Sequence, residues 1–211
     1  MISASVRRLV VTDVDSTFIQ QEVIELLAEH AGTRDLVAEV TERAMRGELD
    51  FAASLRERVA TLRGVPVGAL DDVRRAVRLS DGAAELVAEC HRRGWVFGLV
   101  SGGFEEIVGP LAAEHGITRV RANRLEVADG VLTGRTIGTV VDRAVKEATL
   151  RAWAAAEDVD MAHTVAVGDG ANDLDMIHAA GVGVAFRAKP VVREQAAYAV
   201  DGRLDEVLNL L

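Results

Sequence analysis

Strand-like and helix-like hydrophobic patterns alternate along most of the chain. Short runs of apolar, mostly β-branched residues predict buried strands at 8–13, 95–100, 164–167 and 183–185. Apolar residues spaced at i, i+3 and i+4 predict helices between them, at 82–93, 105–115, 142–156 and 173–180. An alternating stretch at 120–133, which contains Asp129-Gly130, predicts a β-hairpin. This alternation predicts a mostly parallel, doubly wound sheet with right-handed crossovers.

A block of helices interrupts the alternation after the first strand. Four amphipathic patterns follow one another at 20–31, 33–47, 50–64 and 67–79. Asp50 and Pro66 are residue types typical of helix starts. The chain is therefore predicted to fold as an α/β, Rossmann-like core of residues 1–19 and 78–211, with a small helical domain of residues 20–77 inserted after the first strand.

Composition and charge argue against two classes of protein, those that bind nucleic acids and those that span a membrane. The 211 residues carry 24 Lys and Arg against 33 Asp and Glu, a net charge of −9, and only 4% are aromatic. These values argue against a nucleic-acid partner, which needs a basic surface or stacking platforms. No apolar run is long enough for a membrane span, and the single cysteine, Cys90, is predicted to be a buried hydrophobe. A cytoplasmic enzyme or binding domain is the expectation.

The first predicted strand ends in a pair of carboxylates. Asp13 and Asp15 are two residues apart, so both can point to one side of an extended backbone. One could act as a nucleophile toward a phosphoryl group, and the other could protonate the leaving oxygen and then activate water. Taken alone, such a pair is more often an Asx-turn or a helix cap.

Three further sites follow at strand ends or helix starts. Ser101-Gly102-Gly103, predicted as a turn, could bring a hydroxyl and backbone N–H groups to an anion, and Lys146 could reach a phosphate. The stretch from Gly168 to Asp173 offers hard oxygen ligands of the kind that suit Mg²⁺. Each has an ordinary structural alternative. Together they meet at one edge of one sheet, where ligands bind in open parallel sheets.

The motifs DVDSTF at 13–18, SGG at 101–103, Lys146 and VAVGDGANDLDM at 165–176 resemble the haloacid-dehalogenase-type phosphatase superfamily. More narrowly, Glu22 and the runs at 44–59 and 185–190 resemble the phosphoserine phosphatase family, over nearly the whole chain. The resemblance implies a helical cap at 20–77 over the core. It also implies Mg²⁺-dependent hydrolysis of O-phosphoserine through an aspartyl phosphate, as the last step of serine biosynthesis.

The resemblance also implies roles for individual core residues. Asp13 would be the nucleophile and Asp15 the general acid and base. Mg²⁺ would be held by the Asp13 carboxylate, the Asp15 main-chain carbonyl and Asp169. The remaining core residues would bind the phosphoryl group or support the metal site: they are Ser101, Gly102, Lys146 and Asn172 for the phosphoryl group, and Asp173 for the waters of the metal.

In the cap, the resemblance places Glu22 against the substrate ammonium and Arg58 against its carboxylate. Met45 and Phe51 would form an apolar cover. The residues alone do not separate Arg58 from its neighbours Arg56 and Arg63, which lie on the same helical pattern.

Several alternatives stay open at the level of sequence. The same core could transfer the phosphoryl group to homoserine, or serve another small phosphomonoester. A signalling receiver module also uses an acceptor Asp, but it lacks a cap and a second Asp at the position of Asp15. A catalytically inactive binding protein would not need the full set of Asp13, Asp15, Lys146 and Asp169. The expected assembly is a monomer or a homodimer.

Overall fold

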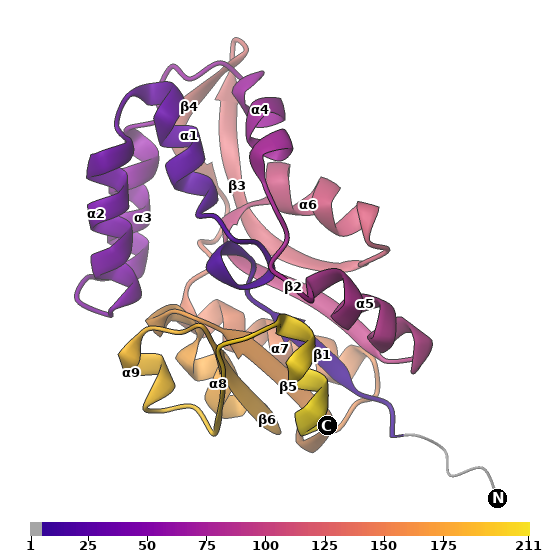
Figure 1. Ribbon diagram of the computed structural model, residues 1–211. Helices are drawn as coiled ribbons and strands as arrows, with labels where there is room; N and C mark the ends of the chain where they lie inside the picture. Colours follow the sequence, from indigo (N-terminus) through magenta and orange to yellow (C-terminus); the bar gives the residue numbers. More distant parts are fainter. Residues whose placement is uncertain (1–5) are drawn as a thin grey trace, which may run out of the picture.

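A seven-stranded sheet runs through the computed structural model, which describes residues 6–211 (Figure 1). The strands are β1 Leu9–Thr12, β2 Val96–Phe104, β3 Arg119–Ala128, β4 Val131–Ile137, β5 Thr164–Gly168, β6 Val182–Phe186 and β7 Tyr198–Val200. Their spatial order is β4-β3-β2-β1-β5-β6-β7, and every neighbouring pair is parallel except β3 and β4. The predicted α/β class with a mostly parallel sheet is confirmed.

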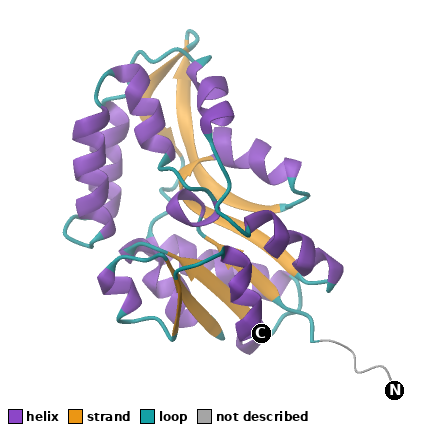
Figure 2. Ribbon diagram, in the orientation of Figure 1, coloured by secondary structure: helices purple, strands orange, loops and turns teal. Residues whose placement is uncertain are grey.

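Helices cover both faces of the sheet (Figure 2). They are α1 Val23–Ala31, α2 Arg34–Met45, α3 Phe51–Ala60, α4 Ala69–Ala76, α5 Ala83–Arg92, α6 Glu105–Glu114, α7 Arg143–Ala156, α8 Leu174–Ala179 and α9 Pro190–Arg193. On β1, Val10 packs in the cluster that contains α5 and α6 residues, whereas Leu9 and Val11 pack in the cluster that contains Leu150 of α7. Alternate side chains of this strand thus fill two cores, which explains its uninterrupted apolar sequence.

The helices α1 to α4 lie between β1 and α5 in sequence and stand beside the β3–β4 hairpin (Figure 1). Backbone hydrogen bonds join the two parts, from Gly64 N to Leu132 O at 2.9 Å and from Leu132 N to Val65 O at 2.8 Å. Leu132 also shares a buried cluster with Val59 of α3. The inserted helices therefore bury their apolar faces partly on a hairpin that the core supplies.

Two connecting segments lead into and out of the inserted helices, and they run side by side. Ile19 and Leu79 form an antiparallel bridge, and Gln20 N donates to Arg78 O at 2.9 Å. The predicted limits of the inserted domain, 20 and 77, fall at these segments and stay a prediction. Residues 1–5 of the predicted core lie outside the described part of the chain.

Some element boundaries differ from the prediction. The stretch 101–103 is not a turn, because β2 continues through it to Phe104 and α6 begins at the next residue. Pro66 does not start a helix but forms a bridge with Val131, and α4 begins at Ala69. Asp50, by contrast, caps α3 as predicted, since its side chain accepts from Ala53 N at 2.7 Å. The strand β7, the short helix α9 and a 3₁₀ segment at Leu204–Leu210 were not predicted.

One expectation from composition, a buried Cys90, is confirmed. Cys90 is completely buried, and burial raises the pKa of its thiol to about 12. None of the helices described has both the length and the apolar character needed to cross a membrane.

Candidate active site

The chain turns sharply after β1, and this turn carries the first two carboxylates. Asp13 N donates to Val167 O at 2.9 Å, and Asp13 Oδ1 accepts from Val14 N at 2.7 Å. Residues 14–18 then form one wide helical turn, within which Ser16 has a left-handed φ of 55°. The turn buries Asp15, whose Oδ1 accepts from Val23 N at 3.1 Å. Backbone N–H groups thus hold both carboxylates in place.

The end of β2 lies next to this turn. Ser101 is fully buried, and its Oγ accepts from Gly103 N at 2.8 Å, which leaves the hydroxyl proton available for another acceptor. Asn123 stabilises the same segment through two hydrogen bonds. Its side chain donates to Gly102 O at 2.8 Å and accepts from Val141 N at 2.8 Å. Nothing in the hydrophobic pattern singled out Asn123, which lies inside a predicted strand.

Lys146 reaches the site from the first turn of α7. Its ammonium lies 2.8 Å from Asp13 Oδ1 and 2.7 Å from Asp173 Oδ1, and the side chain is completely buried. The other oxygen of Asp173 accepts from Asp169 N and Gly170 N at 3.1 Å each. Lys146 therefore links the end of β1 to the loop after β5.

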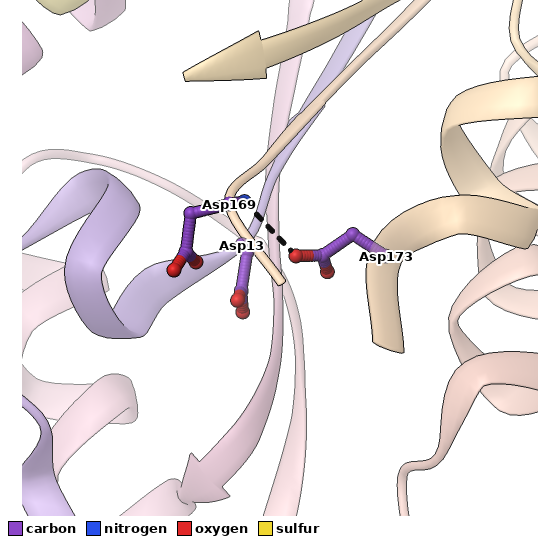
Figure 3. Close-up of side chains that lie close together, drawn as sticks. All are labelled: Asp13, Asp169 and Asp173. Atoms are coloured by element: carbon purple, nitrogen blue, oxygen red, sulfur yellow. Dashed lines mark hydrogen bonds between the residues drawn. The ribbon is translucent and has the colours of Figure 1, made fainter. Parts of the chain in front are cut away.

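Three carboxylates converge at this point (Figure 3). Asp13, Asp169 and Asp173 each offer one oxygen, and these oxygens all lie within 4.8 Å of one another. Thr17 Oγ1 donates to Asp169 Oδ1 at 3.2 Å. Such a buried acidic triad could hold a metal ion. Both oxygens of Asp173 already accept hydrogen bonds from the protein, so Asp13 and Asp169 are freer to coordinate an ion directly.

The charge balance at the triad favours a cation. Burial and the charge of Asp173 raise the pKa of Asp13 to about 7, although Lys146 opposes the rise. Burial, together with Asp13 and Asp173, raises the pKa of Asp169 well above its ordinary range. Burial alone would lower the pKa of Lys146. The carboxylates of Asp13 and Asp173 together have the larger effect and raise that pKa above its ordinary value, so the ammonium stays charged. Negative charge exceeds positive charge here, and a bound cation would relieve the excess.

Asp15 and Glu22 form a second acidic pair. Burial, Glu22 and Asp13 raise the pKa of Asp15 well above its ordinary value. Burial also raises the pKa of Glu22, against the hydrogen bond of 2.6 Å that it accepts from Ser16 Oγ. The raised pKa favours the protonated form of Asp15, the form that a general acid requires.

A cavity of about 330 Å³, including its opening, lies between the sheet edge and the inserted helices. The residues lining it are Asp13, Asp15, Glu22, Ile24, Met45, Phe51, Leu55, Arg58, Gly102, Gly103 and Asn172. The structure thus brings all four predicted cap residues to one cavity with the two carboxylates of the first turn. Four other predicted site residues are not part of this lining: Ser101, Lys146, Asp169 and Asp173. Lys146 connects to it through its ion pair with Asp13.

The inserted helices touch the core around the cavity. A Cβ atom added to Gly102 would lie 2.6 Å from the Phe51 ring, and one added to Gly170 would lie 2.5 Å from Met45 Sδ. Lys189, whose backbone N–H donates to Asp169 O at 2.9 Å, forms an ion pair of 2.7 Å with Glu42 of α2. The cavity is therefore closed by aromatic, thioether and ionic contacts.

Glu22 and Arg58 bring opposite charges to the lining of the cavity. Arg58 is 3% exposed and lies 6.0 Å from the centre of the Phe51 ring. Burial lowers the pKa of Arg58, while Glu22 and Asp15 raise it. A cavity lined by both a carboxylate and a guanidinium suits a ligand that carries an ammonium and a carboxylate.

Residues 10–178 match the family model of the haloacid dehalogenase-like hydrolases. The chain belongs to this family of hydrolases. Among its members, the phosphoserine phosphatase of Streptococcus thermophilus is 55% identical over 209 residues, which span 99% of this chain and 97% of that protein.

Solved structures of other hydrolases of this family agree over the full fold. A phospho-aspartyl intermediate analogue of phosphoserine phosphatase superposes with a TM-score of 0.95 at 38% identity, covering 98% of this chain and 100% of that one. A substrate-bound phosphoserine phosphatase complex gives 0.94 at 37% identity, covering 97% and 98%. The haloacid dehalogenase-like architecture is thus shared over nearly all of the described residues.

Position 103 requires glycine because the Asp15 carboxylate lies too close to leave room for a side chain. A Cβ atom on Gly103 would lie 2.5 Å from Asp15 Oδ2 and 3.0 Å from Ser101 Oγ. We expect Gly103→Ala to displace the Asp15 carboxylate and lower kcat by roughly 100-fold, because sub-ångström placement matters for proton transfer. Steady-state kinetics and a melting curve measure this. An unchanged kcat in a folded variant would mean that the position of Asp15 is not critical.

Sequence reasoning missed several residues that shape the site. Thr17 and Ser16 sit inside the DVDSTF motif, where their hydroxyls bind Asp169 and Glu22. Thr41 and Asn123 had no signal beyond being polar residues in apolar-periodic stretches, and the structure buries both. A buried polar side chain needs a partner, so such positions point to hydrogen bonds that hold a site.

Proposed function

We propose that this hydrolase converts O-phosphoserine to serine and phosphate through an aspartyl phosphate on Asp13, with Mg²⁺ as cofactor. One observation carries the proposal. A single cavity joins the buried pair Asp13 and Asp15 to an acidic and a basic group, Glu22 and Arg58. The relatives named as phosphoserine phosphatases support the same conclusion.

In the first half of the reaction, an oxygen of Asp13 attacks the phosphorus. The bond between phosphorus and the serine oxygen breaks, and Asp15 gives its proton to that oxygen. The raised pKa of Asp15, caused by burial and by Glu22 and Asp13, keeps this proton available. Serine leaves, and Asp15 remains as a carboxylate.

In the second half, Asp15 takes a proton from water while the water oxygen attacks the phosphorus of the aspartyl phosphate. The bond from phosphorus to Asp13 breaks, phosphate leaves, and both aspartates return to their starting states. The contact between Asp15 Oδ1 and Val23 N, at 3.1 Å, keeps this carboxylate in place through both halves.

The phosphoryl oxygens would be bound by Ser101, the Gly102 amide, Lys146 and Asn172. The hydroxyl proton of Ser101 is free to donate, since its oxygen already accepts from Gly103 N. Lys146 supplies the buried positive charge beside Asp13. These groups take up the charge of the transition state.

The residues of the aspartate triad fit Mg²⁺, which prefers a few carboxylate oxygens and retains waters. We propose the Asp13 carboxylate, the Asp15 main-chain carbonyl and Asp169 as ligands, with Asp173 supporting the waters. When bound, the ion would offset the repulsion between the Asp13 carboxylate and the phosphate dianion. The excess of buried negative charge supports this assignment.

Two other residues of the cavity lining would recognise the amino acid. Glu22 would face the ammonium and Arg58 the carboxylate, under the apolar cover of Met45 and Phe51. We further propose that the enzyme acts in the cytoplasm, as a monomer or homodimer and without a nucleic-acid or membrane partner, in the last step of serine biosynthesis.

Removal of the Arg58 guanidinium should affect amino-acid phosphates selectively. A lost charge-assisted contact costs about 2–3 kcal/mol, so we expect Arg58→Ala to lower kcat/KM for phosphoserine on the order of 30–150-fold. The value for p-nitrophenyl phosphate should change little, because that substrate has no carboxylate. Arg56→Ala, on the exposed face of the same helix, is the matched control. Equal losses on both substrates would assign Arg58 to cap closure instead.

A panel of phosphomonoesters tests the function itself. With Mg²⁺ present, we expect kcat/KM for O-phosphoserine to exceed that for O-phosphoethanolamine and p-nitrophenyl phosphate. Addition of homoserine should leave phosphate release unchanged and yield no phosphohomoserine. A better non-amino-acid substrate, or transfer to homoserine, would overturn the proposal.

A further inference from the structure

The guanidinium group of Arg58 is held at two of its three nitrogens. Nε donates to the main-chain oxygen of Ser54 at 3.1 Å, and Nη1 donates to Oγ1 of Thr41 at 2.8 Å. Nη2 is buried and has no hydrogen-bond partner among residues 6–211. Because Arg58 lines the cavity, Nη2 is the nitrogen that remains for a ligand.

Thr41 and Ser54 constrain Arg58 in different ways. Ser54 lies one turn earlier in the same helix, α3. Its contact with Arg58 is therefore local and does not depend on how α3 packs against other helices. Thr41 belongs to α2, is 2% exposed and does not line the cavity. A second contact from a neighbouring helix fixes the plane of the guanidinium, and the plane decides whether its donors can meet both oxygens of a carboxylate.

We propose that Thr41 is a positioning residue that selects substrates carrying a carboxylate. Its hydroxyl oxygen orients Arg58 so that Nη2 is presented to the carboxylate group of the substrate, although Thr41 itself touches no substrate. The inference rests on the proposed function, since it extends the role given there to Arg58. It makes substrate selection depend on a residue outside the cavity.

The two substitutions Thr41→Val and Thr41→Ser separate positioning from packing. Valine has nearly the shape of threonine but cannot accept from Arg58 Nη1. Serine keeps the hydroxyl and loses only a methyl group. A residue that merely fills space would tolerate valine better than serine, whereas a positioning residue would show the reverse order.

The test compares O-phosphoserine with O-phosphoethanolamine, which differ only in the carboxylate, at saturating Mg²⁺. For Thr41→Val we expect KM for phosphoserine to rise about tenfold, as for a lost hydrogen bond to a charged group. Its kcat should be retained, and kcat/KM for phosphoethanolamine should stay within about twofold of wild type. Thr41→Ser should restore KM for phosphoserine. Inhibition by serine, which keeps the carboxylate but lacks the phosphate, should weaken in parallel with KM.

Each contrary result has a distinct meaning. If wild type shows no preference for phosphoserine over phosphoethanolamine, the proposed function fails and this inference fails with it. If wild type has the preference and Thr41→Val keeps it, only the inference is overturned. Equal losses on both substrates, or a Thr41→Ser variant as impaired as Thr41→Val, would show that Thr41 supports cap packing and not carboxylate selection.

Discussion

Replacement of Asp13 by asparagine is expected to abolish turnover while the protein stays folded. The amide has the shape of the carboxylate but is a poor nucleophile, so we expect kcat to fall on the order of 10⁴-fold or more. Lys146 would keep its contact with Asp173 at 2.7 Å, and one of the crowded buried negative charges would be gone. The melting temperature should therefore not fall. Phosphate release and thermal unfolding of the purified variant measure the two effects.

The control for this change is Asp35→Asn, the same chemical replacement at an exposed position in the first turn of α2. It should leave kcat unchanged. Substantial hydrolysis by Asp13→Asn, beyond what a trace of wild-type enzyme would give, contradicts the assignment of Asp13 as the nucleophile.

Removal of divalent cations should lower kcat about as much as Asp13→Asn does. We expect EDTA to abolish activity and Mg²⁺ to restore it, because the buried aspartate triad carries more negative charge than Lys146 offsets. Ca²⁺ should inhibit, since it is larger, takes more ligands and could engage both oxygens of Asp13. Mg²⁺ should also raise the melting temperature of the EDTA-treated protein, because an ion that binds only the folded state stabilises it.

Two controls belong to the metal experiment. Na⁺ at equal ionic strength should not restore activity or raise the melting temperature, and Asp169→Asn should weaken the dependence of the melting temperature on Mg²⁺. Full activity in EDTA, or in Ca²⁺ alone, would mean that Asp13 does not act beside a bound Mg²⁺.

The part of the site at the carboxyl ends of the strands could be predicted from sequence, because two local rules determine where those ends lie. Apolar runs predict the strands, and parallel strands send their carboxyl ends to one edge, so Asp13 and Asp169 were expected at the same edge of the sheet. The structure aligns Thr12 with Val167 in the parallel pair β1 and β5. Each aspartate therefore follows its strand close to the other.

Features that depend on distant parts of the chain were not predictable in this way. The cap arginine is an example, since Arg56, Arg58 and Arg63 look alike in a helical pattern, yet only Arg58 is buried. The resemblance to a known family singled it out, not the periodicity. Arg58 is held inside by a tertiary contact, the hydrogen bond of 2.8 Å from its Nη1 to Thr41 Oγ1 of the neighbouring helix α2, which the helical pattern does not show.

The prediction of a turn at Ser101-Gly102-Gly103 was wrong for a related reason, since β2 continues through these residues. Glycines after a strand usually signal a turn. Here they keep the strand extended where Phe51 and the Asp15 carboxylate approach too closely for any side chain. The requirement comes from partners that lie far away in sequence, so a local rule could not detect it.

Identification of the phosphorylated residue decides whether Asp13 is the nucleophile. Wild-type enzyme turning over O-phosphoserine would be quenched in acid, treated with borohydride and digested for peptide mass spectrometry. An aspartyl phosphate at Asp13 would be reduced to homoserine at that position, and Asp15 and Asp169 would stay unmodified. A phosphoryl group trapped on any other residue, or turnover with no modification of Asp13, would contradict the account.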